Sequence, residues 1–450
     1  MTVLKHRENL IAWLLDQYMH VLNEDCPYEI NTYKKIFLNK YHDFCKKIEN
    51  MYGFYDYLTL KYQIRNAYLQ MVSLRNCDFW CSGNIEMNPS NLSSYLQSVK
   101  NFYARTSGSK QQIKAESNFK RDFIAPVMCN STDYAFYLTD SGMSAVNLAI
   151  HLSHYFSHIG PLYVQKDLYY EVFPVLKAVY KQVNFIDVGD IYDLLASDSE
   201  ISCIFAEYTR QTTIENPLSL QELLLRISHH KQKSLLFVIL DRTFFSLDDQ
   251  FYDLISKIKL PHNTVIISVE SLLKHHQYGL DMVNLGACFI YSSMCHKKIF
   301  LDVTDLLYNA LSCRPNPMMC DRLFPFNKKI LENQFNIAKS NAALLHQSLV
   351  DFSVIPVTMS KNTYISTADI LYIPVHNFEI GEEIISRILK KQAINHGQSF
   401  GFDITRLCCE KDILTKEVYL RISVGTEDET VFEQMSIYMR DILKHILGNI

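Results

Sequence analysis

The sequence predicts an α/β protein with three parts: a mostly parallel sheet with helices on both faces, a smaller C-terminal α+β domain and an extra N-terminal helical region. Three observations support this. From about residue 130, short apolar runs alternate with helical patterns, as expected for a parallel sheet with helical crossovers. Residues 1–90 repeat apolar side chains with a helical period, and the chain after residue 325 combines one long helical pattern with strand-like segments.

Composition narrows the class of protein. The 450 residues are 48% hydrophobic and 20% charged, as expected for two or three globular domains. A net charge of −4 gives no sign of polyanion binding. The chain has no run of 18 apolar residues that would predict a membrane span, and its first residues look like an amphipathic helix, not a signal peptide. The 12 cysteines lack paired CxxC spacing, so we expect reduced thiols and a cytoplasmic protein.

Residues 1–90 are expected to form a helical N-terminal extension. A wide apolar face runs from Leu10 to Leu22, further periodic segments follow at about 31–50 and 54–75, and turn residues at 81–90 mark a boundary. Two roles fit this pattern. The extension could pack on the core or at an oligomer interface, or it could dock to a partner protein.

Residues 91–325 are expected to form the large α/β domain, and residues 326–450 the small C-terminal α+β domain. The small domain begins with a helical pattern from Asn327 to Leu349 and contains strand-like segments at 370–375 and 418–424. The expected strands of the large domain lie at 135–138, 162–164, 183–186, 203–206, 235–240 and 265–267.

Lys274 is the first candidate for chemistry. It stands just beyond the apolar run Val265–Ile267, and ligands of open α/β sheets bind at the carboxyl ends of strands. A partly desolvated lysine there is suited to form a Schiff base. The same position also suits a solvated loop lysine.

Asp241 ends the most hydrophobic expected strand. A carboxylate there is costly to bury unless it meets a cation, such as a protonated pyridine nitrogen, although it could instead cap the following turn. Asp241 lies 33 residues before Lys274, a length that suits one helix and one strand. The two strand ends would then be neighbours in a parallel sheet.

Four other positions are suited to ligand binding. The segment Ser141-Gly142-Met143 opens a helix after a strand, which suits phosphate binding but also a plain helix cap. Tyr169 follows another strand and could stack on a flat cofactor or belong to the core. Arg105 and Arg421 could each hold an anion or lie on a solvated surface.

The order of these segments resembles the Cys/Met-metabolism family of pyridoxal-phosphate (PLP) enzymes, the cystathionine γ-synthase/γ-lyase group of fold type I. The resemblance covers about residues 95–450. Its most specific part is Arg421-Ile-Ser-Val-Gly-Thr-Glu-Asp428, similar to the family's Arg-Leu-Ser-Val-Gly-Leu-Glu-Asp. The other matching segments are Tyr103-Ala-Arg105 to Glu116, Asp140-Ser-Gly-Met143 to Val146, Tyr169 to Phe173, Asp241-Arg-Thr-Phe244, Ser271-Leu-Leu-Lys274 with Asp281, and Ser399-Phe-Gly401.

The resemblance implies a role for each segment. Lys274 would carry PLP as a Schiff base and move protons at the substrate Cα and Cβ, and Asp241 would keep the pyridine nitrogen protonated. Tyr169 would stack on the ring and is a candidate for proton transfer. Arg421, helped by Ser399, would hold the substrate α-carboxylate. Further cofactor contacts are implied for Ser141, Gly142, Met143, Thr243 and Ser271, and, from the neighbouring subunit of a homodimer or homotetramer, for Tyr103 and Arg105.

Several family residues are replaced in this chain. Leu273 stands for the threonine before the lysine, and Arg242 stands for the asparagine after the pyridine-binding aspartate. Tyr170 and Glu171 would crowd or charge the substrate pocket. The altered pocket argues against routine methionine biosynthesis and favours a specialised-metabolite enzyme.

We therefore expect a PLP-dependent transferase or lyase that performs γ- or β-replacement or elimination on a sulfur-containing or O-activated amino acid. The motifs do not distinguish replacement from elimination. One alternative is a catalytically degenerate homologue that acts as a binding or scaffold subunit. Another is an aminotransferase or decarboxylase on the same fold. No metal site is expected.

Overall fold

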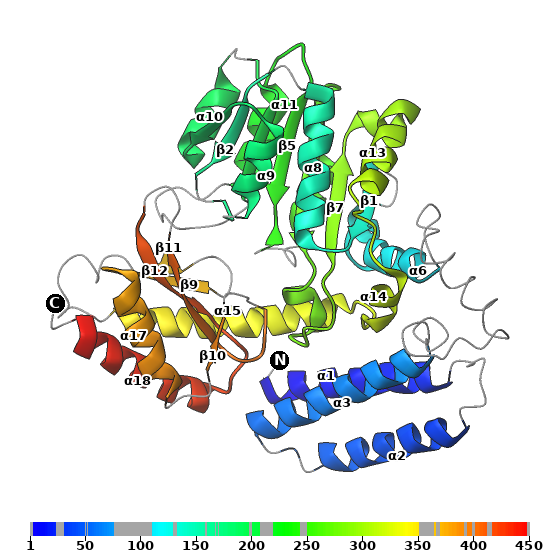
Figure 1. Ribbon diagram of the computed structural model, residues 1–450, viewed down its shortest axis with the longest axis vertical. Helices are drawn as coiled ribbons and strands as arrows, with labels where there is room; N and C mark the ends of the chain where they lie inside the picture. Colours follow the sequence, from blue (N-terminus) through cyan, green and yellow to red (C-terminus); the bar gives the residue numbers. More distant parts are fainter. Residues whose placement is uncertain are drawn as a thin grey trace, which may run out of the picture.

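The computed structural model describes two sheets with their helices and a group of three N-terminal helices (Figure 1). Among the residues it describes, no helix is both long and apolar enough to cross a membrane. The described residues are 3–23, 31–49, 51, 53–75, 110–128, 133–157, 160–166, 168–169, 171–197, 200–207, 219–243, 250–350, 364–365, 370–390, 394–397, 401–411 and 416–447.

The larger sheet has seven strands in the order β1-β7-β6-β5-β4-β2-β3. All of them run in one direction except β7, which pairs antiparallel with both β1 and β6. Every expected strand is present, with bounds shifted by a few residues, whereas β7 was not among those expected. The strands are β1 (Tyr134–Thr139), β2 (Leu162–Gln165), β3 (Val183–Ile186), β4 (Cys203–Glu207), β5 (Leu236–Asp241), β6 (Thr264–Ser271) and β7 (Gly286–Tyr291).

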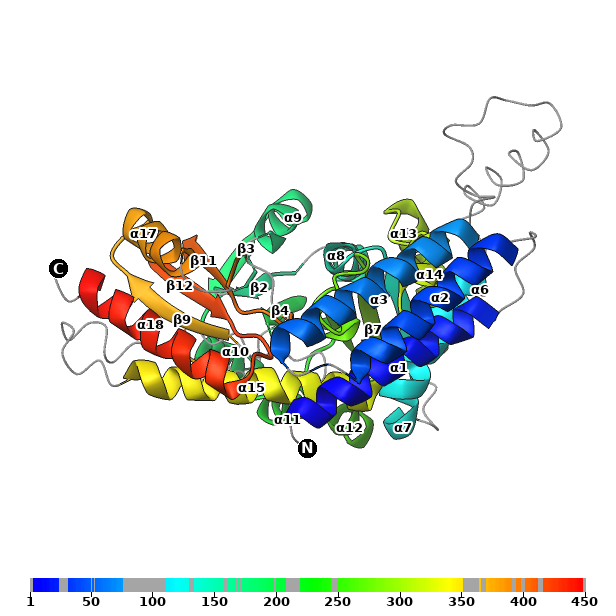
Figure 2. The ribbon, with the colours of Figure 1, turned by 90° about the horizontal axis from the view of Figure 1, so that it is seen from below.

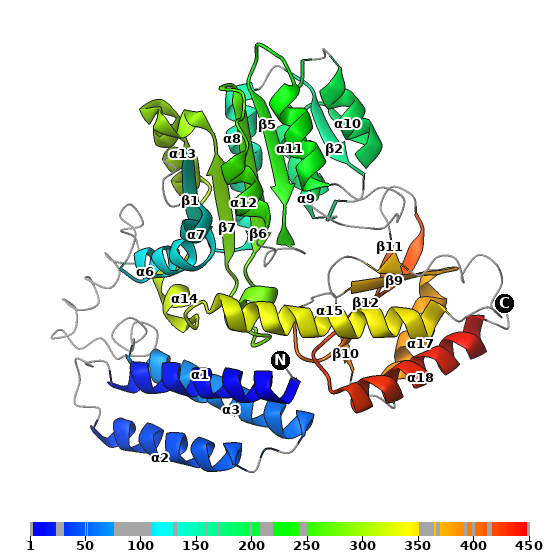
Figure 3. The same ribbon diagram turned by 180° about the vertical axis from the view of Figure 1, so that it is seen from behind.

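Helices cover both faces of this sheet, which explains why its central strands are apolar on both sides. On one face, α8 (Gly142–Ser157), α9 (Val172–Val179) and α13 (Lys298–Ala310) pack on side chains such as Phe237 and Ile239 (Figure 1). On the other, α10 (Val188–Ala196), α11 (Leu220–His229) and α12 (Gln250–Lys257) pack on Val238 and Leu240 (Figure 3). Short elements include α6 (Lys110–Phe119), a π-helical turn (Lys120–Ile124), α7 (Ala125–Met128), α14 (Pro317–Arg322) and 3₁₀ turns at His275–Gln277 and Ser293–His296.

The smaller sheet has five strands in the order β10-β11-β12-β9-β8, and all pairs except β10 with β11 are antiparallel. One face is apolar and packs on α15 (Lys328–Val350), α17 (Phe378–Leu389) and α18 (Glu429–Leu447). Helix α15 runs from beneath the larger sheet to the smaller one (Figures 1 and 3). The strands are β8 (Tyr364–Ile365), β9 (Ile370–Val375), β10 (Asn395–His396), β11 (Arg406–Lys411) and β12 (Val418–Ser423).

The three N-terminal helices lie side by side and pack on the rest of the chain (Figure 2). They are α1 (Val3–Asn23), α2 (Asn31–Ile48) and α3 (Phe54–Arg75). Helix α1 contacts α15, and α3 contacts α14. The buried Leu10, Leu14 and Tyr18 belong to the same apolar cluster as Val238 and Leu240 of the large sheet. Of the roles left open by the sequence, packing on the core is therefore the one observed.

The parallel strands of the large sheet point their carboxyl ends toward α15 and the small sheet (Figures 1 and 3). In open α/β sheets ligands bind at this edge. The fold therefore predicts a ligand-binding site at the ends of β1, β5 and β6.

Candidate functional site

Asp241 and Ser271 end two neighbouring parallel strands, β5 and β6, which pair along their length. Side chains alternate across a sheet, so Asp241 lies on the same face as Phe237 and Ile239, the face covered by α8. Ser271 lies on that face too, after Val265, Ile267 and Val269. Helix α8 begins at Gly142. Two strand ends and one helix N-terminus therefore meet on one face of the sheet.

Two hydrogen bonds join Asp241 to Ser271 through Thr243. The Thr243 N–H donates to Asp241 Oδ1 at 2.9 Å, and the Ser271 N–H donates to Thr243 Oγ1 at 3.0 Å. Gly142 packs so closely that a Cβ placed there would lie 2.7 Å from the Ser271 Cβ. The Ser141 hydroxyl accepts from the Ser144 N–H at 3.1 Å and so caps α8. The structure thus brings together five of the residues predicted for cofactor binding.

Lys274 follows β6 by three residues and is half-buried. Its pKa is lowered to about 8, first by burial and then by the positive charges of Arg421 and Arg406. A pKa near 8 leaves part of the amine neutral at physiological pH, as a nucleophilic lysine needs. The half-buried Tyr169 and Met143 pack against the apolar layer beneath α8, on the Asp241 face of the sheet.

Arg421 is already paired inside the chain, which the sequence did not indicate. Its Nη1 donates to Glu410 Oε1 at 2.6 Å, and its side chain is only 6% exposed. Burial acts to lower its pKa, but the neighbouring Tyr372 and Glu410 raise it by more, so the guanidinium remains a cation. A substrate carboxylate at Arg421 would therefore have to share this cation with Glu410.

Arg242, one of the departures from the family pattern, points away from Asp241. It is fully buried, and its guanidinium carbon lies 3.8 Å from the ring centre of Phe251 and 4.9 Å from that of Tyr252. Burial raises the pKa of the nearby Glu270 to about 7, although the charge of Arg242 opposes this rise. Arg242 thus belongs to the layer of α12 and leaves the face that carries Asp241 unchanged.

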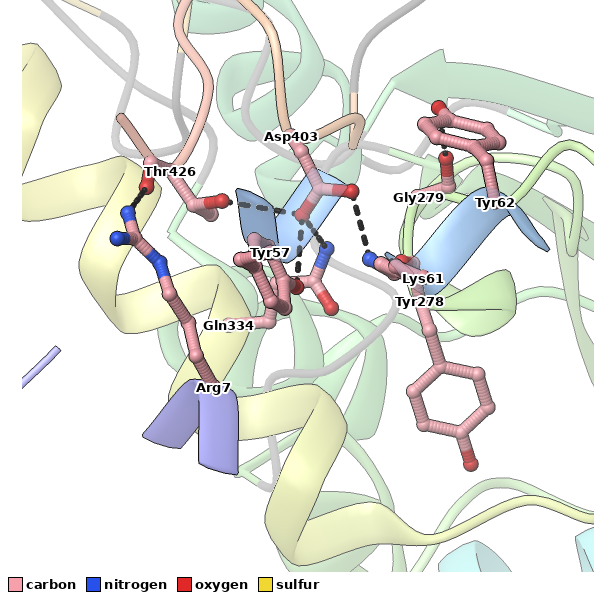
Figure 4. A network of polar contacts seen from close by, with 9 residues as sticks. All are labelled: Arg7, Tyr57, Lys61, Tyr62, Tyr278, Gly279, Gln334, Asp403 and Thr426. Atoms are coloured by element: carbon pink, nitrogen blue, oxygen red, sulfur yellow. Dashed lines mark hydrogen bonds and ion pairs between the residues drawn. The ribbon is translucent and has the colours of Figure 1, made fainter. Parts of the chain in front are cut away.

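A buried polar network ties the N-terminal helices to the loop that follows Lys274 (Figure 4). Lys61 Nζ lies 2.6 Å from Asp403 Oδ2, both side chains are fully buried, and Lys61 also donates to the carbonyl oxygen of Tyr278. The other donors to the Asp403 carboxylate are Tyr57 (3.3 Å), Gln334 (3.3 Å) and Thr426 (3.1 Å). Sequence reasoning missed this network. A lysine on the apolar helix face of Tyr57, Ile64 and Tyr68 was the available signal.

Three predicted site residues, Tyr103, Arg105 and Ser399, lie outside the described residues, as do Tyr170 and Phe244. Their roles, and the shared active site that Tyr103 and Arg105 imply, stay predictions. Within the described ranges, no group of three His, Cys, Asp or Glu side chains is placed to hold a metal ion.

The chain resembles known proteins in structure but not in sequence. No model of a known protein family matches the chain, and no curated protein matches it in sequence. Solved structures do match. The apo methionine γ-lyase of Micromonospora echinospora superposes with a TM-score of 0.53 and 16% identity, covering 75% of this chain and 86% of that one. The chain has the fold of this γ-lyase.

Two structures of cystathionine γ-synthase from Xanthomonas oryzae pv. oryzae match equally well, one with aminoacrylate and cysteine and the other with cystathionine. Each has a TM-score of 0.53 and covers 77% of this chain and 88% of its own, with identities of 14% and 15%. The predicted fold class, fold type I with a smaller C-terminal α+β part and an N-terminal helical region, is confirmed. At identities of 14–16%, the similarity to the γ-lyase and γ-synthase structures establishes the fold and not the activity.

Proposed function

We propose that the chain binds PLP at the carboxyl ends of β1, β5 and β6 and catalyses replacement or elimination at Cγ or Cβ of an amino acid. The observation that carries this proposal is the meeting of Asp241, Ser271 and the N-terminus of α8 at one sheet edge, three residues before Lys274, in a fold shared with γ-lyase and γ-synthase enzymes. No sequence match supports it, so it rests on this geometry.

The residues present fit the cofactor. Helix α8 has 16 residues, and the N–H groups of Gly142 and Met143 in its first turn have no partner within the helix, which suits a phosphate, whereas the Ser144 N–H is capped by Ser141. The close contact between Gly142 and Ser271 makes this end of the site narrow, and the Ser141 and Ser271 hydroxyls add donors. Asp241 is 7% exposed, and a carboxylate so buried suits a protonated ring nitrogen.

The side chains of the site would then have separate roles in the reaction. PLP, when bound, supplies an electron sink conjugated to the substrate amine. Lys274 would hold the cofactor in the resting state and later accept and return protons at the substrate Cα and Cβ. Its lowered pKa makes both steps accessible near neutral pH. Tyr169 would flank the ring. The family resemblance implies Arg421 for the substrate α-carboxylate, and the pair of Arg421 with Glu410 opposes that role.

The test is cofactor uptake. The purified protein with added PLP should turn yellow, and borohydride should fix one pyridoxyl group to the peptide that contains Lys274, as read by mass spectrometry. Lys274→Ala should lose the fixed group. Lys257→Ala is the matched control, because Lys257 is exposed on α12 and paired with Asp253. A wild-type protein that takes up no PLP would refute the proposal.

The pair between Arg421 and Glu410 favours a second candidate, a PLP-fold homologue that lost its activity and serves as a binding or scaffold subunit. The same uptake experiment separates the two. If PLP is fixed, turnover of O-activated homoserines should be compared with turnover of cystathionine, because the products distinguish replacement from elimination and from transamination.

We also propose a homodimer or homotetramer in which Tyr103 and Arg105 complete the neighbouring subunit's site. Mass determination by sedimentation tests the assembly. Mixing Arg105→Ala subunits with Lys274→Ala subunits tests the shared site, because hybrids should regain sites with both residues intact.

A further inference from the structure

The face of the small sheet that points away from α15, α17 and α18 carries four polar side chains that are close to Lys274 or to one another. Side chains alternate along β11, so Leu407 and Cys409 face the helices α15, α17 and α18, whereas Arg406 and Glu410 face the other way. The antiparallel register places Ser423 of β12 directly opposite Arg406, and Arg421 opposite Cys408. Arg406, Glu410, Arg421 and Ser423 therefore share one face.

This polar face adjoins Lys274. Gly401, which has a φ of 77°, packs directly on the backbone of Lys274, since a Cβ there would lie 2.6 Å from the Lys274 carbonyl carbon. The next residue, Phe402, places its ring under Arg406, whose guanidinium carbon lies 3.5 Å from the ring centre. Arg406 is thus held by the same short segment that packs on Lys274.

The two arginines of this face are in different states. Arg421 is neutralised by Glu410 at 2.6 Å. Arg406 is half-buried, and in the part of the chain that the structure describes its side chain makes no hydrogen bond and no ion pair. Its Nε is shielded from solvent without a partner, and so is the hydroxyl of Ser423, which is 3% exposed. Burial lowers the pKa of Arg406, and the charge of Asp281 opposes this lowering.

Buried donors without partners are costly, and two of them side by side beside a reactive lysine suggest a ligand that supplies the acceptors. We propose that Arg406 and Ser423 form the subsite for the carboxylate of the amino acid that reacts at Lys274. This inference rests on the proposed function. The planar guanidinium fork matches a carboxylate, and the Ser423 hydroxyl adds a third donor.

Glu410 then has a defined effect on specificity. It occupies Arg421, so a second carboxylate placed there would meet a carboxylate already bound to the same cation. The site should therefore accept a monocarboxylic α-amino acid and reject one whose second carboxylate reaches Arg421.

The subsite is tested with L-norvaline and L-norvalinamide, which differ in the carboxylate and carry no leaving group. Each is titrated against borohydride fixation of PLP to Lys274, because an amine bound in the site protects Lys274. In wild type the acid should protect at a concentration at least about tenfold lower than the amide, as expected for a charged hydrogen bond. Arg406→Gln should bring the ratio close to one, Arg406→Lys should restore part of it, and Ser423→Ala should lower it by about threefold to tenfold.

Two controls complete the design. Arg387→Gln on α17, whose arginine pairs with the exposed Glu383, should keep the wild-type ratio. Saturation-transfer NMR on the PLP-free full-length protein should detect norvaline, but not norvalinamide, in wild type and neither in Arg406→Gln. This second readout decides the subsite even where no PLP is fixed, which would be a failure of the proposed function instead. An unchanged ratio or unchanged norvaline binding in folded Arg406→Gln and Ser423→Ala overturns the inference.

Discussion

The ion pair between Lys61 and Asp403 offers the sharpest test of how the N-terminal helices are attached. We predict that Lys61→Met destabilises their docking by about 3–5 kcal/mol, the usual cost of removing one partner of a buried pair. Methionine keeps the length and most of the volume of the side chain, so the change is chiefly one of charge.

The magnitude follows from what Asp403 retains. Both side chains are fully buried, and without Lys61 the carboxylate keeps only the neutral donors of Tyr57, Gln334 and Thr426 among the described contacts. The carbonyl oxygen of Tyr278 loses its Lys61 donor as well. A carboxylate without a cation in such a place is strongly disfavoured. Lys61→Met/Asp403→Asn should therefore cost less than the sum of its two single changes, by about 2 kcal/mol or more.

Trp13 is the natural probe for this prediction. It lies on α1, and its ring centre is 4.7 Å from that of Tyr278. The chain has two tryptophans, so Trp80→Phe leaves Trp13 as the single reporter of docking. Urea unfolding followed by Trp13 fluorescence gives the free energy of undocking. Lys47→Met is the matched control, because the Lys47 pair with Asp43 is exposed and should contribute about 0–1 kcal/mol. A Lys61→Met effect within 1 kcal/mol of that control would refute the reasoning.

Three further predictions concern the candidate site. Gly142→Ala should weaken PLP uptake at least about tenfold, because the new Cβ would lie 2.7 Å from the Ser271 Cβ, whereas Gly189→Ala, with open space around it, should have no effect on uptake. Glu410→Gln should lower the free energy of unfolding by about 3–5 kcal/mol by leaving Arg421 without its anion. Glu383→Gln, at an exposed position of α17, should change it by less than about 1 kcal/mol in the same denaturant titration. The rate of PLP attachment to Lys274 should rise with pH around a midpoint of about 8, because the neutral amine reacts; a midpoint near 10.5 in stopped-flow absorption would contradict the lowered pKa. For the same group the unfolded chain binds more protons between pH 8 and 10.5, so its contribution makes the PLP-free protein more stable as pH rises through that window.

The features best predicted from the sequence are those that depend on neighbouring residues, such as buried strands and the polar residues that follow them. The run 235–240 is apolar because parallel strands bury both faces, and this property places Asp241 at a strand end without any structure. Lys274 follows by the same reasoning from the next apolar run. Strand β7 escaped prediction although it is equally apolar, since no alternation of strands and helices marks an antiparallel strand that returns directly after β6.

Pairing between distant residues could not be predicted. Arg421 meets Glu410 because β11 and β12 pair in one register, and a shift of one residue would turn Glu410 to the opposite face. Lys61 and Asp403 are separated by 342 positions, and the sequence shows only a lysine on an otherwise apolar helix face. Arg406 carried no motif, and its unpaired state emerges only when its neighbours are known.

These contacts bear on how the N-terminal helices should be tested. The loop after Lys274 is held from two sides, by Gly401 at the Lys274 backbone and by Lys61 at the carbonyl of Tyr278. Gly401, which packs on Lys274, and Asp403, which pairs with Lys61, both belong to residues 401–403, and this segment continues to Arg406. Removing residues 1–75 would therefore uncover Asp403 and the apolar side chains that α1 and α3 bury, instead of releasing a detachable extension. Loss of activity or an altered oligomeric mass after such a truncation would not identify an interface. Single changes such as Lys61→Met, which leave the apolar contacts in place, are the variants that separate positioning of the Lys274 loop from assembly.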